Sequence, residues 1–395
     1  MFWIRPDLAQ LSALGALAQA GKWLDTALFD IDGVLIDTSA SYRLSVIAAT
    51  ERLTRLMLGE RLDALEAPDA LHVTTDDVVR FKLAGGFNND WYLTQTLTAL
   101  CVAQAREWRG QPEASRTLAQ WAALAAEATH CGQGGAAWLH ATVPASAIPD
   151  LAVARWAHDE CYWGANLVRV LYGHAPQYAP EAPGVVQNER LLLEPALLPA
   201  LRAQGITHFG VITGRIPPEL ANVLRRLTMA SGLPEERLVV ARDVRVERAI
   251  AVIGEAMNRV DHGEAAAPAP VLGRSPFSLL LTGAHYSKPD PLALAHALRE
   301  LRASAALYIG DTADDLDLVL RYRAASDRGA TTDTTETASI GAWGIPTLAV
   351  MVASDATAPT FERRGADIIL PHVRELPTAL NALRERLIAE RGVAS

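Results

Sequence analysis

The sequence has few cysteines, and their number and spacing argue against two classes of protein. Its 395 residues include only Cys101, Cys131 and Cys161. An odd and sparse set without Cys-x-x-Cys spacing favours neither a disulfide framework nor a zinc site. A reducing cytoplasm is the compartment that fits such a chain best.

The sequence also lacks an excess of basic residues and a long apolar run. The formal net charge is -9, with both signs mixed along the chain, so no basic face is expected for nucleic acid. No run reaches the ~20 apolar residues that cross a bilayer. The apolar stretch from Leu8 to Ala20 is interrupted by Gln10 and Gln19, which predicts an amphipathic helix rather than a signal segment. We therefore expect small-molecule chemistry, without nucleic acid or membrane as a partner.

What the sequence does contain is a repeated strand pattern. Three apolar stretches, Thr26 to Asp30, His208 to Thr213 and Ala305 to Gly310, end at polar or glycine residues and precede helix-like segments. Strands that alternate with helices predict a parallel sheet, which binds ligands at the C-terminal strand ends. Further strands are predicted at Leu238 to Ala241, Leu279 to Leu281, Ile345 to Val350 and Asp367 to Leu370.

A helical insertion is predicted within this α/β pattern. Between Thr38 and Gly205, Ala, Leu, Arg, Glu and Trp dominate at helical spacing, and proline-rich residues 176–183 indicate a return linker. A second irregular stretch, residues 263–276, predicts a surface loop. We expect two domains: an α/β core of three layers from residues 1–37 and 184–395, and a mostly helical domain from residues 38–183.

Four short motifs follow the predicted strands in a fixed order. They are Asp30-Ile31-Asp32-Gly33-Val34, Thr213-Gly214-Arg215, Lys288-Pro289, and Gly310-Asp311 with Asp314 and Asp315. In this order they resemble the four motifs of the haloacid dehalogenase superfamily, and the resemblance covers most of the chain outside the insertion. It implies a Rossmann-like parallel core. The insertion resembles the helical cap of the family's phosphatase and phosphomutase branch, which closes over the active site and selects the leaving group.

Phosphoryl transfer explains why carboxylates and a cation are needed together. The transferring group carries spread negative charge, so a carboxylate nucleophile is repelled unless a hard divalent cation lies between them. Asp30 and Asp311 can supply part of the octahedral oxygen shell of Mg²⁺. The resemblance implies that the backbone carbonyl of Asp32 is a further ligand, and that Asp315 holds the metal directly or through water.

The resemblance also assigns roles in catalysis. Asp30 would form an aspartyl-phosphate, and Asp32 would protonate the leaving alkoxide and then take a proton from the attacking water. Thr213, the backbone amide of Gly214 and the Lys288 ammonium would bind the phosphoryl oxygens.

Each motif taken alone also has a structural interpretation. Acidic residues after a strand often cap helices, which applies to Asp32 and Asp315. Asp314 and Asp317 are interpreted as helix N-terminal charge. Arg215 either contacts substrate or holds its own loop. For the cation, Arg242 and Arg245 are alternatives, but the context Tyr-Ser-Lys-Pro-Asp-Pro favours Lys288.

The most unusual segment of the insertion runs from Lys82 to Trp91. Two glycines interrupt a helical pattern there and precede polar side chains and an indole. One interpretation is a substrate-recognition loop; the other is a helix stop at Gly85-Gly86 with Asn89 or Asp90 capping the next helix. The substrate-binding residues predicted here are Lys82, Asn88, Asn89 and Trp91.

The sequence therefore predicts a Mg²⁺-dependent phosphatase acting on a small phosphorylated metabolite. A phosphomutase of the same fold stays open, as does a catalytically silent binding protein. A dehalogenase is disfavoured because Asp32 supplies an acid that a halide leaving group does not need. Phosphoglycolate, histidinol phosphate and sugar phosphates all remain candidate substrates.

Overall fold

The structure is a computed structural model that divides into two compact units. It describes residues 2–6, 23–59, 62–215, 279–282, 288–327 and 342–392, together with 219, 220, 223, 226 and 227. One unit comprises Met1–Asp37 and Arg190–Ser395, and the other comprises Thr38–Glu189. The return to the first unit thus falls after Glu189, whereas the sequence placed it after residue 183.

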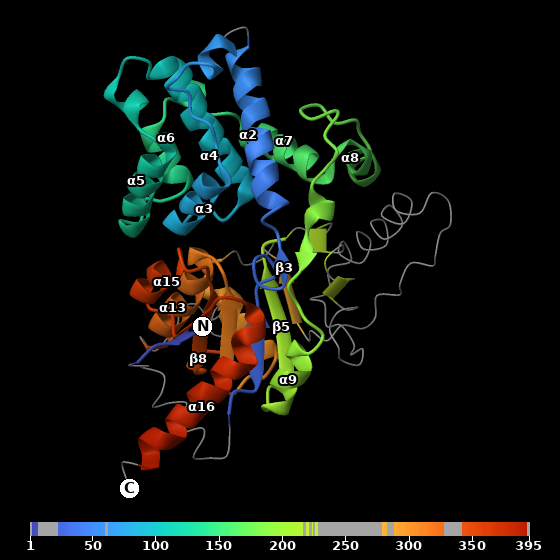
Figure 1. Cartoon of the computed structure of the whole chain (residues 1–395), viewed down its shortest axis with the longest axis vertical. Coiled ribbons are helices and arrows are strands. Elements are labelled where there is room, and N and C mark those ends of the chain that lie inside the picture. Colours follow the sequence, from blue (N-terminus) through green and yellow to red (C-terminus); the bar gives the residue numbers. More distant parts are fainter. Residues whose placement is uncertain are drawn as a thin grey trace, which may run out of the picture. The chain divides into compact units, whose positions relative to one another are not determined.

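The first unit contains a sheet whose seven strands have the order β1-β9-β8-β7-β2-β5-β6 among the described residues (Figure 1). The strands are β1 (Trp3–Ile4), β2 (Thr26–Phe29), β5 (His208–Thr213), β6 (Leu279–Thr282), β7 (Ala306–Gly310), β8 (Thr347–Val352) and β9 (Ile368–Leu370). Strand β1 pairs with β9 antiparallel, and the other pairings are parallel. A separate two-stranded ribbon pairs β3 (Ile36–Asp37) with β4 (Arg190–Leu191).

The central strands are buried along their whole length. Every residue of β2 and β7 is buried, and β8 is buried except at its last residue. Continuous apolar runs are typical of parallel strands covered on both faces. The α-helices of this unit that lie in described residues are α9 (Leu197–Ala203), α12 (Pro291–Glu300), α13 (Ala313–Asp327), α15 (Ala358–Arg364) and α16 (Leu376–Gly392). Helices α12 and α13 pack together against the strands, while α9 and α16 form another contacting pair, which lies in front of the strands in Figure 1.

The predicted α/β architecture is confirmed, as are the strands predicted near Thr26, His208, Leu279, Ala305 and Ile345. The strand ending at Leu370 is also present. Strands β1, β3 and β4 were not predicted. The helix at 8–20, the strand at 238–241 and the loop at 263–276 lie outside the described residues.

The second unit is helical in its described residues. Its α-helices are α2 (Tyr42–Leu58), α3 (Thr75–Ala84), α4 (Asp90–Val102), α5 (Leu118–His130), α6 (Ala136–Thr142), α7 (Leu151–Trp163) and α8 (Ala165–Tyr172). Its core contains an aromatic cluster in which Trp108 stacks on Trp121 at 4.9 Å and Phe81 meets Phe87 edge-on at 5.5 Å. This unit therefore has a hydrophobic core of its own. Across the described part of the chain, no helix combines the length and the apolar character needed to cross a membrane.

Candidate functional site

The sheet brings three of the four motifs to one edge by strand register. Phe29 pairs with Val211 of β5 on one side and with Ile309 of β7 on the other. The residues that follow these strands therefore leave the sheet side by side. The backbone N–H of Asp30 donates to the Ile309 carbonyl at 2.8 Å, which extends the pairing by one residue.

Asp30 is a buried carboxylate in contact with a cation. It is 4% exposed, and its Oδ2 lies 2.9 Å from Nζ of Lys288. Its Oδ1 accepts a hydrogen bond from the backbone N–H of Ile31 at 2.8 Å. The pKa of Asp30 is raised to about 7, mainly because the carboxyl group is buried. The Lys288 charge lowers this pKa, whereas the Asp315 and Asp32 charges raise it. The site therefore disfavours a negative charge on Asp30 unless more positive charge is present.

Lys288 and Asp315 form the most buried ion pair of the site. Nζ of Lys288 lies 2.7 Å from Oδ1 of Asp315, and the two side chains are 6% and 0% exposed. Burial opposes the Lys288 charge, but Asp30 and Asp315 hold its pKa well above the usual value. Burial likewise opposes the Asp315 charge, and yet Lys288 and several donors keep the pKa of Asp315 below its usual value.

Tyr308 and Thr312 complete the surroundings of Asp315, and neither was predicted from the sequence. The Tyr308 hydroxyl donates to Oδ1 at 2.7 Å, while the Thr312 hydroxyl and backbone N–H donate to Oδ2 at 2.6 and 3.0 Å. The backbone N–H of Asp311 adds a longer bond of 3.3 Å. The threonine after Gly-Asp could have indicated this side-chain turn. No sequence pattern indicated that Tyr308 would bind Asp315, because an apolar strand predicts only that its residues are buried.

Asp311 faces Asp30 and Asp315 across a small space. One carboxylate oxygen from each of the three residues lies within 4.8 Å of the others. Gly33 is adjacent: its φ is 70°, and a Cβ built there would overlap the Asp311 carboxylate. Only glycine therefore allows the turn after β2 to approach Asp311 so closely.

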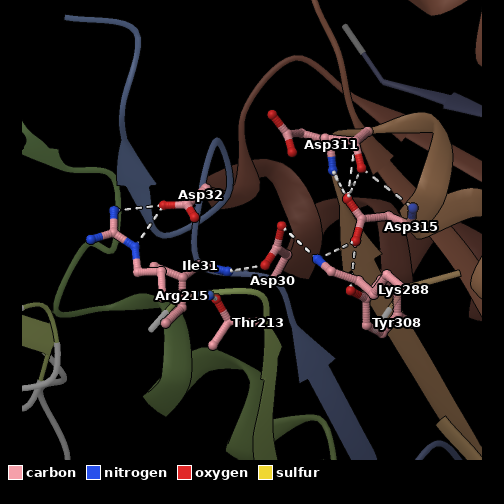
Figure 2. A network of polar contacts seen from close by, with 10 residues as sticks. Asp30, Ile31, Asp32, Thr213, Arg215, Lys288, Tyr308, Asp311 and Asp315 are labelled. Atoms are coloured by element: carbon pink, nitrogen blue, oxygen red, sulfur yellow. Dashed lines mark hydrogen bonds and ion pairs between the residues drawn. The ribbon is translucent and has the colours of Figure 1, made fainter. Parts of the chain in front are cut away.

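Asp32 lies on the other side of Asp30 and is held by Arg215 (Figure 2). Nε and Nη2 of Arg215 both donate to Oδ1 of Asp32, at 2.9 and 2.6 Å. The backbone N–H of Arg215 donates to Oγ1 of Thr213 at 3.2 Å. Figure 2 thus shows Asp30, Asp32, Thr213, Lys288, Asp311 and Asp315 gathered in one network. The sequence left two interpretations of Arg215, a substrate contact or a residue that holds its own loop. The structure adds a third, because Arg215 is a hydrogen-bond partner of Asp32.

The described residues of the site can hold an oxygen-coordinated divalent cation. Asp30, Asp311 and Asp315 place one carboxylate oxygen each within 4.8 Å of one another, with the Lys288 ammonium beside two of them. Hard oxygen donors and a surplus of negative charge suit Mg²⁺. Burial is the main cause of the raised pKa of Asp30, and the neighbouring Asp315 and Asp32 charges add to it.

Three of the residues predicted in the insertion, Lys82, Asn89 and Trp91, have local partners within the second unit. Lys82 pairs with Asp90 at 2.9 Å, and the Asn89 side chain caps α4 by accepting from the N–H groups of Trp91 and Tyr92. Helix α3 ends at Ala84. The helix stop and cap are therefore present, and ligand binding by Lys82, Asn88, Asn89 and Trp91 stays a prediction.

The Trp91 indole is held in place by two side chains of α7. Its Nε1–H donates to Oδ1 of Asp159 at 2.9 Å, and the Arg155 guanidinium lies over the ring at 4.3 Å. This arrangement fixes the ring in one orientation.

Comparison with known proteins gives weak similarities only. No protein-family model and no curated protein matches the chain. Among solved structures, it is similar to the phosphatase Tt82 from Thermococcus thioreducens, with 21% identity over 76% of this chain and 88% of that one, and a TM-score of 0.38. A predicted phosphoglycolate phosphatase from Haemophilus somnus shares 13% identity over 90% of this chain and 98% of that one, with a TM-score of 0.37. CbbY from Rhodobacter sphaeroides, solved in complex with phosphate, shares 18% sequence identity over 89% of this chain and 96% of that one, with a TM-score of 0.31.

At these values the comparisons carry no argument about activity, and the fold is defined by the chain's own geometry. The central strands are parallel in the described core, and the four motifs meet beyond the ends of β2, β5 and β7. The described core is an α/β fold with a mainly parallel, Rossmann-like sheet.

Proposed function

We propose that this chain is a Mg²⁺-dependent phosphatase that hydrolyses a small phosphate monoester with Asp30 as nucleophile. One observation carries the proposal. The Asp30 carboxylate, buried at the end of β2, contacts Lys288 at 2.9 Å and lies within 4.8 Å of carboxylate oxygens of Asp311 and Asp315. A buried carboxylate among other carboxylates costs free energy, and a role in chemistry explains why it is there.

The metal would be held by Asp30, Asp311 and the backbone carbonyl of Asp32. Asp315 already accepts hydrogen bonds from Tyr308, Thr312 and Lys288. A carboxylate has about four lone-pair sites, so we assign Asp315 to holding the metal through water. When bound, Mg²⁺ supplies charge neutralisation between the Asp30 carboxylate and an anionic phosphoryl group.

The reaction would proceed in two displacements. An Asp30 oxygen forms a bond to phosphorus while the bond to the leaving oxygen breaks, and Asp32 gives that oxygen a proton. Water then attacks the same phosphorus, Asp32 takes its proton, and the bond to Asp30 breaks to release inorganic phosphate. Both halves need a carboxyl group beside Asp30 that solvent can reach, and the Asp32 side chain is 29% exposed.

The phosphoryl oxygens would be bound by Thr213, the Gly214 amide and Lys288. The Lys288 ammonium has three N–H donors, and Asp30 and Asp315 account for two of them among the described residues. We assign the third to a phosphoryl oxygen. Lys288 then neutralises charge that moves from Asp30 to the phosphoryl group as the bond forms.

We further propose that residues 38–183 act as a cap that selects the substrate, and that the enzyme works in the cytoplasm. The three cysteines are free thiols, of which Cys101 and Cys161 are buried. Free thiols are stable in a reducing compartment. The substrate would be a small polar ester such as phosphoglycolate, histidinol phosphate or a sugar phosphate.

A panel of these esters, with released phosphate as the readout, tests the proposal. Wild-type protein should release phosphate with Mg²⁺ and not with a chelator. Asp30→Asn should release none, while Asp355→Asn, an exposed matched control, should behave as wild type. Mg²⁺ should also raise the unfolding midpoint of the wild type. A folded, Mg²⁺-stabilised protein that hydrolyses none of the esters would contradict the proposal, and accumulation of a bisphosphorylated sugar would favour a mutase.

A further inference from the structure

The side chain of Arg215 is almost completely buried although it carries a permanent charge. Arg215 is 2% exposed, and its guanidinium contacts Asp32, whose side chain is 29% exposed. A buried guanidinium costs free energy unless it is paired with an anion. The Asp32 carboxyl group accepts hydrogen bonds from that guanidinium through Oδ1, whether or not Oδ2 carries a proton, so the two side chains fix each other.

The contact distinguishes the two oxygens of Asp32. The hydrogen bonds from Nε at 2.9 Å and from Nη2 at 2.6 Å both go to Oδ1. Figure 2 shows the other carboxylate oxygen turned away from the guanidinium. An oxygen that accepts two charged N–H groups is a poor site for a proton, so Oδ2 is the oxygen better suited to proton transfer.

The same turn also presents the hydroxyl of Thr213. The backbone N–H of Arg215 donates to Oγ1 of Thr213 at 3.2 Å. Thr213 is the last residue of β5, and this strand pairs directly with β2, which ends just before Asp30. One short segment therefore connects a phosphoryl-binding residue with the acid that acts on the leaving group.

We propose that Arg215 is a positioning residue that holds Oδ1 of Asp32, and that Oδ2 transfers the proton in both halves of the reaction. The inference rests on the proposed phosphatase function. It departs from the expectation that Arg215 binds substrate. A substrate-binding arginine would affect all esters alike, whereas a positioning role for the acid predicts dependence on the leaving group.

The kinetic test compares phenyl phosphate with 4-nitrophenyl phosphate, whose leaving group needs much less protonation. General acid catalysis contributes about 10²- to 10⁴-fold. Because hydrolysis of the phosphoryl-enzyme is common to both esters, the comparison uses kcat/KM, which reports the first displacement. Arg215→Met should lower kcat/KM about 100-fold for phenyl phosphate and less than about 10-fold for 4-nitrophenyl phosphate. Asp32→Asn should show the same preference in kcat/KM more strongly, Arg215→Lys should recover part of the loss, and the exposed Arg374→Met should match wild type. Equal losses of kcat/KM on both esters would overturn the positioning role.

A second measurement does not depend on activity. Denaturant unfolding of Arg215→Met, Asp32→Asn and the double variant forms a double-mutant cycle. The double variant should shift the midpoint by less than the sum of the single shifts, and additive shifts would overturn the contact itself. If the wild type hydrolyses neither ester, the phosphatase proposal fails and the catalytic role falls with it, while the cycle still decides whether the pair exists.

Discussion

Removal of the Asp30 charge should stabilise the metal-free protein at neutral and alkaline pH. The perturbation is Asp30→Asn, which keeps the shape of the side chain and leaves Lys288 paired with Asp315 at 2.7 Å. Burial raises the pKa of Asp30 from 3.8 to about 7. A carboxyl whose pKa is raised by folding contributes stability below its unfolded pKa, and this contribution is lost as the pH rises through the folded pKa.

The size of the effect follows from the shift. A difference of about 3 pKa units, at ~1.4 kcal/mol per unit, corresponds to roughly 4 kcal/mol. The stability of Asp30→Asn minus that of wild type should therefore rise between pH ~4 and pH ~7 and level off above it. Titrating groups that do not interact with Asp30 are common to both proteins and cancel in the difference.

Urea unfolding in a chelator, repeated across this pH range, measures the difference directly. Asp355→Asn, at an exposed position, is the matched control and should give a flat difference close to zero. Saturating Mg²⁺ should reduce or reverse the advantage of Asp30→Asn, because the cation stabilises the wild-type carboxylate. A flat difference for Asp30→Asn, or a less stable variant at pH 8, would refute the electrostatic account of the site.

Three further substitutions test other parts of the structure. Lys288→Met leaves buried carboxylates without their cation, so it should cost roughly 3–5 kcal/mol in urea unfolding and abolish phosphate release. Gly33→Ala places a Cβ against Asp311 at a positive φ, so it should cost roughly 1–3 kcal/mol and weaken Mg²⁺ stabilisation in thermal unfolding; unchanged Mg²⁺ response would count against the site geometry. Trp91→Phe removes the hydrogen bond to Asp159 and should lower the unfolding free energy by roughly 1–3 kcal/mol, and no change would show that the bond contributes nothing.

The sequence was informative about features that depend on the residues next to one another along the chain. Apolar runs specified the central strands, and the residue after each run had to leave the sheet at the same edge. This logic placed Asp30 and Thr213 side by side, because β2 and β5 are neighbours in register. The same logic could not predict β1, because a strand of two residues is too short to show a periodic hydrophobic pattern.

Contacts between distant side chains were beyond sequence patterns. Arg215 reaches Asp32 across 183 positions, and no local signal distinguishes that partner from a substrate. Tyr308 was expected only as part of a buried strand, yet its hydroxyl donates to Asp315. Such pairs depend on which strands become neighbours, a property of the whole fold.

The most direct test of the central claim is to trap the phosphoryl group on the protein. Asp32→Asn lacks the base for the second displacement but can still attack an ester with a good leaving group. With 4-nitrophenyl phosphate and Mg²⁺, this variant should release about one equivalent of nitrophenolate in a burst and gain the mass of one phosphoryl group on the peptide that contains Asp30. The double variant with Asp30→Asn should gain none. A phosphoryl group on another residue, or steady turnover by the Asp32→Asn, Asp30→Asn protein, would contradict Asp30 as the nucleophile.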